Sequence, residues 1–217
     1  MGFDFHGRGS KYSEQKYHWY HFSGTDYNAK NGKTAIYKIL GDKTKGWADS
    51  GDVDSEKGNY DYLMFADLDY SHPEVEADVI NWGQWLTKEV TLKGIRFDAV
   101  KHFSEEFLNK FVTELTKKHG EGWFFVGEYW KDDLNDMARY IERMGNKFSL
   151  FDAPLVHNFS KLSKTENADL RTVFDDTWVK IEPVNAVVSS KYLDGHAKLI
   201  KTKDARNEPR YTTVSGP

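Results

Sequence analysis

The pattern of apolar and polar positions divides the chain into two parts. In residues 1–72, short apolar and aromatic segments alternate with glycines and show no helical period. Aromatic and β-branched residues favour strands and glycines mark turns, so strands are expected at 34–40 and 60–65. The aromatic cluster at 17–22 is also typical of a strand. We therefore expect an irregular, β-rich subdomain over residues 1–72.

From residue 71 onward, predicted strands and helices alternate. Apolar residues at helical spacing predict helices over 73–90, 104–120 and 132–144. The sequence from Ser71 to Glu74 resembles a capping box, Ser104 is expected to cap the second helix, and Gly145 ends the third. Short apolar segments predict strands at 94–100, 123–129, 147–151 and 185–188. Such alternation indicates βαβ units and a parallel sheet, whose strands all end at one edge.

Composition excludes several classes of protein. Aromatic residues make up 15% of the 217 residues, which is too much apolar surface for a disordered chain. A formal charge of −4 argues against nucleic-acid binding, and no apolar run of about 18 residues indicates a membrane span. The chain has no cysteine, which excludes disulfides, thiolate zinc sites and cysteine nucleophiles.

Charged residues at the ends of two predicted strands form the candidate site. Arg96 and Asp98 share one face of a strand, whose faces are normally both apolar. They form either a structural ion pair or a carboxylate nucleophile held ionised by a guanidinium. Glu128 occupies the corresponding position on the next strand, which places the two carboxyls roughly 5–6 Å apart. That separation suits a retaining glycosidase, and the rings around Glu128 favour its protonated, general-acid form.

Four segments carry a resemblance to a known family. Residues 94–102 (Gly-Ile-Arg-Phe-Asp-Ala-Val-Lys-His) resemble the nucleophile motif of the α-amylase family, glycoside hydrolase family 13. Residues 125–130 (Phe-Val-Gly-Glu-Tyr-Trp) resemble its acid/base motif. Residues 2–9 and 60–70 are similar to the B domain of liquefying bacterial and intracellular fungal α-amylases.

The resemblance implies retaining endo-hydrolysis of α-1,4-glucosidic bonds in starch, glycogen or maltodextrin. Asp98 would be the nucleophile and Glu128 the acid/base, with Arg96 orienting Asp98. The residues expected to line the substrate cleft are Arg96, Lys101, His102 and Trp130. No nucleic-acid or membrane partner is expected.

The resemblance also implies a calcium ion (Ca²⁺) between the B domain and the barrel. Asp61 and Asp67 match the carboxylate ligands, and His102 matches a residue that contributes its backbone carbonyl. Without the resemblance, these aspartates are equally well read as turn residues. Ser23 and Ser71 stand where bacterial relatives carry further metal-binding aspartates, so one calcium is expected.

The implied fold is an α/β fold: an incomplete (β/α)8 TIM-barrel segment over residues 73–188, preceded by a β-rich, B-domain-like subdomain. A complete barrel takes about 250 residues. The family's early strands would precede Met1, and the Asn-His-Asp motif with the third catalytic aspartate does not occur. Residues 189–217 are expected to form a divergent, poorly ordered tail.

This incompleteness leaves other interpretations open. One is an inactive amylase fragment that binds calcium or glucan, and another is a related transglycosylase. Open sheet edges favour a homo-oligomer or a domain swap. The likeness to intracellular fungal enzymes and the absence of a signal sequence slightly favour the cytoplasm.

Overall fold

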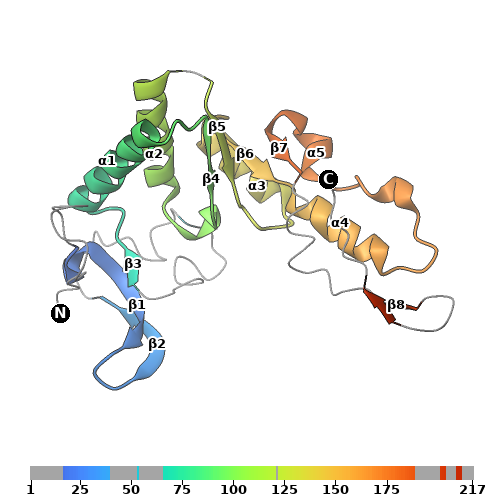
Figure 1. Ribbon diagram of the computed structural model, residues 1–217, viewed down its shortest axis with the longest axis horizontal. Coiled ribbons are helices and arrows are strands. Elements are labelled where there is room, and N and C mark those ends of the chain that lie inside the picture. Colours follow the sequence, from blue (N-terminus) through green and yellow to red (C-terminus); the bar gives the residue numbers. More distant parts are fainter. Residues whose placement is uncertain are drawn as a thin grey trace.

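The computed structural model describes residues 17–39, 53, 66–120 and 122–188, together with the backbone of strands at 201–203 and 209–211. Figure 1 shows an antiparallel sheet at one side of the molecule and a parallel sheet with its helices at the centre. Within the described residues, no helix is long and apolar enough to cross a membrane.

The antiparallel sheet has the strand order β2-β1-β3. Its strands are β1 (Phe22–Asn28), β2 (Lys33–Lys38) and β3 (Ala66–Leu68). β2 agrees with the strand predicted at 34–40, whereas the strand predicted at 60–65 lies outside the described residues. This sheet is the described part of the expected β-rich subdomain.

The aromatic cluster at 17–22, predicted as a strand, instead contains the 3-10 helix η1 (Trp19–His21). The backbone N–H of His18 donates to Nδ1 of His21 at 2.8 Å. This side-chain to backbone bond stabilises the tight turn at the expense of the extended conformation. The prediction of a strand was therefore wrong for residues 19–21.

The parallel sheet has the order β4-β5-β6-β7, and all its neighbouring strands run parallel. Its strands are β4 (Gly94–Phe97), β5 (Phe124–Gly127), β6 (Ser149–Phe151) and β7 (Ala186–Val187). The helices are α1 (Pro73–Glu89), α2 (Glu105–His119), α3 (Leu134–Arg143), α4 (Ala153–Ser163) and α5 (Trp178–Ile181). One helix, or the pair α4 and α5, precedes each strand, so the expected α/β fold with a barrel-like parallel segment is confirmed.

The main core lies between the sheet and helices α2 and α3. Phe107, Phe111 and Leu115 of α2 are all buried, as their spacing predicted. α1 approaches α2 so closely that a Cβ at Gly83 would lie 2.4 Å from the Phe111 ring. Only glycine fits at that point without a shift of the ring.

Two predicted boundaries differ from the structure. The N-cap of α1 is His72 instead of Ser71, because the His72 ring accepts from the Glu74 N–H while the Ser71 hydroxyl donates to Asp69. β4 ends at Phe97, three residues early, because Ala99 has a left-handed backbone (φ 46°) and leads into the 3-10 helix η4 (Val100–His102).

The segment expected to be a poorly ordered tail contains two short strands, β8 (Lys201–Lys203) and β9 (Pro209–Tyr211). They pair antiparallel. The rest of that segment lies outside the described residues.

Candidate active site

The candidate site lies where β4 and β5 end. Phe97 and Gly127 are register partners, and Asp98 and Glu128 directly follow them. The backbone N–H of Glu128 donates to the carbonyl of Phe97 at 2.9 Å, and the N–H of Val100 donates to the carbonyl of Glu128 at 3.1 Å. These bonds hold the two strand ends together at the point where both carboxyl side chains leave the sheet.

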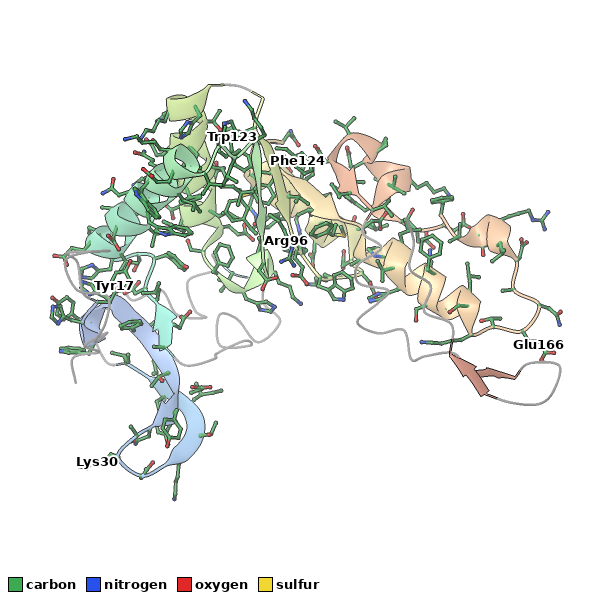
Figure 2. All side chains as sticks on the ribbon, viewed as in Figure 1. Tyr17, Lys30, Arg96, Trp123, Phe124 and Glu166 are labelled. Carbon is green, nitrogen blue, oxygen red and sulfur yellow. The ribbon has the colours of Figure 1, made fainter. Side chains whose placement is uncertain are left out.

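Arg96 joins the two carboxyl groups. Its Nη2 lies 2.8 Å from Oδ1 of Asp98 and 2.6 Å from Oε2 of Glu128. Since both oxygens contact one nitrogen, they lie at most the sum of these distances, 5.4 Å, apart. In Figure 2, Trp123 and Phe124 mark the start of β5, and Arg96 lies towards the opposite end of the sheet. A retaining glycosidase has its carboxyls about 5–5.5 Å apart and an inverting one about 6.5–9.5 Å, so the limit of 5.4 Å is shorter than the inverting separation.

The two carboxyl groups differ in exposure, and the pKa of one of them is lowered. The hydrogen bond from Glu128 is the largest cause that lowers the pKa of Asp98, and the Arg96 charge and hydrogen bond lower it further against the cost of desolvation. The side chain of Asp98 is 74% exposed and that of Glu128 only 16%. An exposed carboxylate with a lowered pKa therefore stands beside a largely buried carboxyl group.

The remaining predicted substrate-binding residues follow the same two strands. Lys101 and His102 lie in η4 and are both buried. Trp130, two residues after Glu128, packs its ring edge-on against His157 at 5.8 Å. The sequence analysis missed His157, because α4 has only weak helical periodicity and no motif marks this histidine.

Asp67, a predicted calcium ligand, lies on β3. Its carboxylate accepts a hydrogen bond from the Ser23 hydroxyl of β1. Burial, as the largest cause, and the nearby Asp69 carboxylate raise the pKa of Asp67 to about 6, although the Ser23 bond opposes this shift. Asp61 lies outside the described residues, while His102 occupies the turn after β4. Two neighbouring carboxylates, the half-buried Asp67 and the buried Asp69, fit a site for a hard cation such as Ca²⁺.

A second cluster, which the sequence analysis missed, brings His21, His72 and Glu74 within 4.8 Å of one another. Two imidazoles and a carboxylate are a common zinc donor set. However, Nδ1 of His21 accepts from the His18 N–H, so its neutral ring carries the proton on Nε2 and donates it to Glu74 at 2.9 Å. Nε2 then has no lone pair for a metal, and the cluster serves to tie η1 to the start of α1.

The chain is similar in sequence to several curated proteins. The chain is 42% identical over 195 residues to the α-amylase of Bacillus licheniformis, and 42% identical over 195 residues to that of Geobacillus stearothermophilus. These matches cover 89% of this chain and 36% and 34% of the relatives. The cytoplasmic α-amylase of Escherichia coli is 32% identical over 187 residues, covering 85% of this chain and 37% of that protein. No protein-family model matches the chain.

Among solved structures, the α-amylase of Geobacillus thermoleovorans complexed with acarbose aligns with 51% of this chain and 24% of its own. The sequence identity is 28% and the TM-score 0.46.

Fold and site together define an α/β protein with a carboxylate pair at the ends of adjacent parallel strands. Its sequence is similar to those of α-amylases over most of the chain. It spans about a third of the length of the curated relatives that it matches.

Proposed function

We propose that this chain carries the catalytic carboxylates of an α-amylase-type hydrolase that cleaves α-1,4-glucosidic bonds with retention. The observation that supports this most strongly is the pair Asp98 and Glu128, bridged by Arg96, with Asp98 exposed and Glu128 largely buried. A glycosidase needs this asymmetry, because one carboxyl must attack as an anion while the other donates a proton. The substrates are α-glucans such as starch, glycogen and maltooligosaccharides.

In the first step, a carboxylate oxygen of Asp98 bonds to the anomeric carbon as the glycosidic C–O bond breaks. The proton of Glu128 passes to the departing oxygen, so no alkoxide is released. In the second step, the Glu128 carboxylate takes a proton from water, whose oxygen attacks the anomeric carbon and releases Asp98. The anomeric carbon must enter between the two carboxyls, so substrate replaces their direct hydrogen bond.

Arg96 is a positioning residue in this scheme. One nitrogen contacts both carboxyls, and the guanidinium lies 5.8 Å from the centre of the Phe151 ring on β6. These contacts fix the Asp98 anion opposite Glu128 and disfavour its protonation. Lys101, His102 and Trp130 would line the same rim of the sheet, where Trp130 offers a flat apolar ring to a sugar face.

We also propose one structural calcium ion, held by Asp67, Asp61 and the backbone carbonyl of His102. The support is the half-buried position of Asp67 beside the buried Asp69, two carboxylates whose charge a divalent cation would neutralise. Calcium would link β3 to the turn that follows the nucleophile. Its contribution would be to hold these segments together, since the bond-breaking steps need only the two carboxyls.

The competing proposal is an inactive amylase fragment that binds calcium or glucan. It is favoured by the 74% exposure of Asp98 and by the absence of an Asn-His-Asp motif from the sequence. Release of reducing ends from soluble starch separates the two proposals. We expect turnover by the wild type, a loss of more than 100-fold in Glu128→Gln, and no change in Glu142→Gln, whose carboxylate is exposed on α3.

Equal rates in the wild type and Glu128→Gln would reject the assignment of Glu128. No turnover by the wild type, with maltooligosaccharide binding measured by calorimetry, would establish the binding fragment instead.

A further inference from the structure

Three side chains, those of Trp130, Asp132 and His157, form a group beside the candidate carboxyls. Trp130 and Asp132 lie in the segment that follows β5, and His157 lies in the second turn of α4, the helix that follows β6. Because β5 and β6 run parallel, their carboxyl ends lie at the same rim of the sheet. The group therefore lies at the rim that carries Glu128.

The Asp132 carboxylate fixes the orientation of the His157 ring. Its Oδ1 contacts Nδ1 of His157. An ionised carboxylate can only accept a hydrogen bond, so Nδ1 carries the proton and the lone pair of the neutral ring is on Nε2. Among the described residues, none forms a hydrogen bond with this Nε2. Nε2 of His157 is thus an oriented acceptor for a hydroxyl group.

Asp132 stands on a segment that is fixed to α3. The Lys131 ammonium contacts the carboxylate of Asp136 on α3. Asp133, the N-cap of α3, accepts hydrogen bonds from two backbone N–H groups of the first turn, at 2.9 and 3.1 Å. These contacts on either side of Asp132 hold its backbone in place, so its carboxylate can hold the His157 ring in one orientation.

The rings of Trp130 and His157 meet almost at a right angle. Their centroids are 5.8 Å apart and their planes are inclined by 85°. A sugar carries C–H groups on its faces and hydroxyls around its rim, so it can rest on one ring while a polar atom of a perpendicular ring reaches a hydroxyl. Trp130 follows Glu128 by two residues, which places such a sugar next to the bond that Glu128 would protonate.

We propose that His157 binds the glucose unit on the leaving-group side of the scissile bond, beside Trp130. A hydroxyl of that glucose donates a hydrogen bond to Nε2 of His157, and Asp132 is a positioning residue that acts through His157. This inference rests on the proposed function, because Glu128 defines the leaving-group side. The interaction contributes to bond cleavage only when the leaving group is a sugar.

Two substrates with different leaving groups test this inference. α-Maltotriosyl fluoride releases fluoride, which makes no contact with His157, whereas maltohexaose releases a sugar. We expect His157→Ala to lower kcat/KM on maltohexaose about tenfold, through the loss of one hydrogen bond, and to leave kcat/KM on the fluoride unchanged. Asp132→Asn should lower kcat/KM about threefold on maltohexaose alone, because an amide no longer fixes the proton on Nδ1.

The matched controls are His18→Ala and Asp175→Asn. His18 lies at the start of η1, and Asp175 forms an exposed ion pair with Lys180, so neither variant should change either rate. His157→Gln keeps a polar group that can hydrogen-bond a sugar and should recover part of the rate on maltohexaose. Circular dichroism confirms that each variant folds.

The outcomes separate this inference from the proposed function. Equal losses on both substrates in His157→Ala, which a merely structural role would give, or unchanged rates on both would overturn the inference and leave the proposed function in place. If the wild type does not cleave maltohexaose, the proposed function fails, and calorimetry with maltotriose then tests His157 by itself. Binding should be at least tenfold weaker in His157→Ala than in the wild type. Equal affinities, or no binding by the wild type, would overturn the inference.

Discussion

The carboxyl group of Glu128 hydrogen-bonds that of Asp98, thirty residues earlier in the chain, and one nitrogen of Arg96 contacts both. The parallel register of β4 and β5 creates this relationship, because it places the two residues side by side after the last paired position. Because Asp98 is exposed and Glu128 largely buried, we expect the two carboxyls to have different catalytic tasks.

Variants of Asp98 and Glu128 should differ in how their kcat depends on the leaving group of the substrate. Glu128→Gln should lower kcat on starch by about 10²–10⁴-fold, but much less on an aryl maltooligosaccharide whose phenol leaves without protonation. Asp98→Asn should abolish both reactions, because the nucleophile is lost whatever the leaving group. Steady-state kinetics on the two substrates provide the measurement. Equal losses on both substrates in Glu128→Gln would refute its role as the acid.

Removal of Arg96 should change the pH profile. Arg96 lowers the pKa of Asp98, so Arg96→Met should raise this pKa towards its ordinary value. Asp98 is active as the anion, so the acid limb of kcat/KM should move to higher pH. The matched control is Arg171→Met, which removes an exposed arginine of the 3-10 helix η5 (Leu170–Thr172). It should leave the pH profile of kcat/KM unchanged. A lower kcat/KM with an unshifted acid limb would mean that Arg96 acts only through packing.

Calcium should stabilise the wild type through Asp67. At pH 7.5 we expect millimolar Ca²⁺ to raise Tm by several degrees and EDTA to reverse the effect. Asp67→Asn should abolish this response, whereas Asp26→Asn on β1 should retain it. Differential scanning fluorimetry is sufficient. A wild-type Tm that is the same in EDTA and in Ca²⁺ would exclude the calcium site.

Without calcium, Asp67 should make stability depend on pH. Its pKa is raised in the folded state from 3.8 to about 6, so the folded protein binds the proton more tightly than the unfolded chain. Stability is then greatest below pH 3.8 for this group and falls as pH rises through about 6, by about 3 kcal/mol. Urea unfolding in EDTA from pH 5 to pH 7.5 should show the part of this fall that lies above pH 5, about 1.4 kcal/mol, in the wild type. The free energy of unfolding should fall less steeply with pH in Asp67→Asn. Equal slopes in the variant and the wild type would contradict the raised pKa of Asp67.

Gly127 should be required for the position of Glu128. A Cβ at Gly127 would lie 2.5 Å from the Phe148 ring and 3.0 Å from Val100. Gly127→Ala should therefore destabilise the fold by about 1–3 kcal/mol and lower kcat. Phe148→Leu should relieve part of the clash, so the double variant should be more stable than the sum of the single effects predicts. If thermal unfolding shows that the effects of the two substitutions on stability simply add, the close contact between position 127 and the Phe148 ring would be contradicted.

Local pattern was a good guide wherever one element decides its own structure. The helical spacing of Phe107, Phe111 and Leu115 predicted α2 and its buried face. Trp82 on α1 is also apolar, but it lines a pocket with Ile95 and Phe97 of β4 and is 53% exposed. Spacing identifies an apolar face, but whether that face is buried depends on what the fold places against it.

The sequence alone determined the alternation of strands and helices and the position of two carboxylates at neighbouring strand ends. These features depend on side-chain period, caps and glycines within about twenty residues. Only the tertiary structure decided that one nitrogen of Arg96 joins Asp98 to Glu128, and that His21 is bound by His18 and Glu74 instead of standing open to a metal. Such contacts depend on register and side-chain orientation between distant segments, and no local pattern encodes a distance of 2.6 or 2.9 Å.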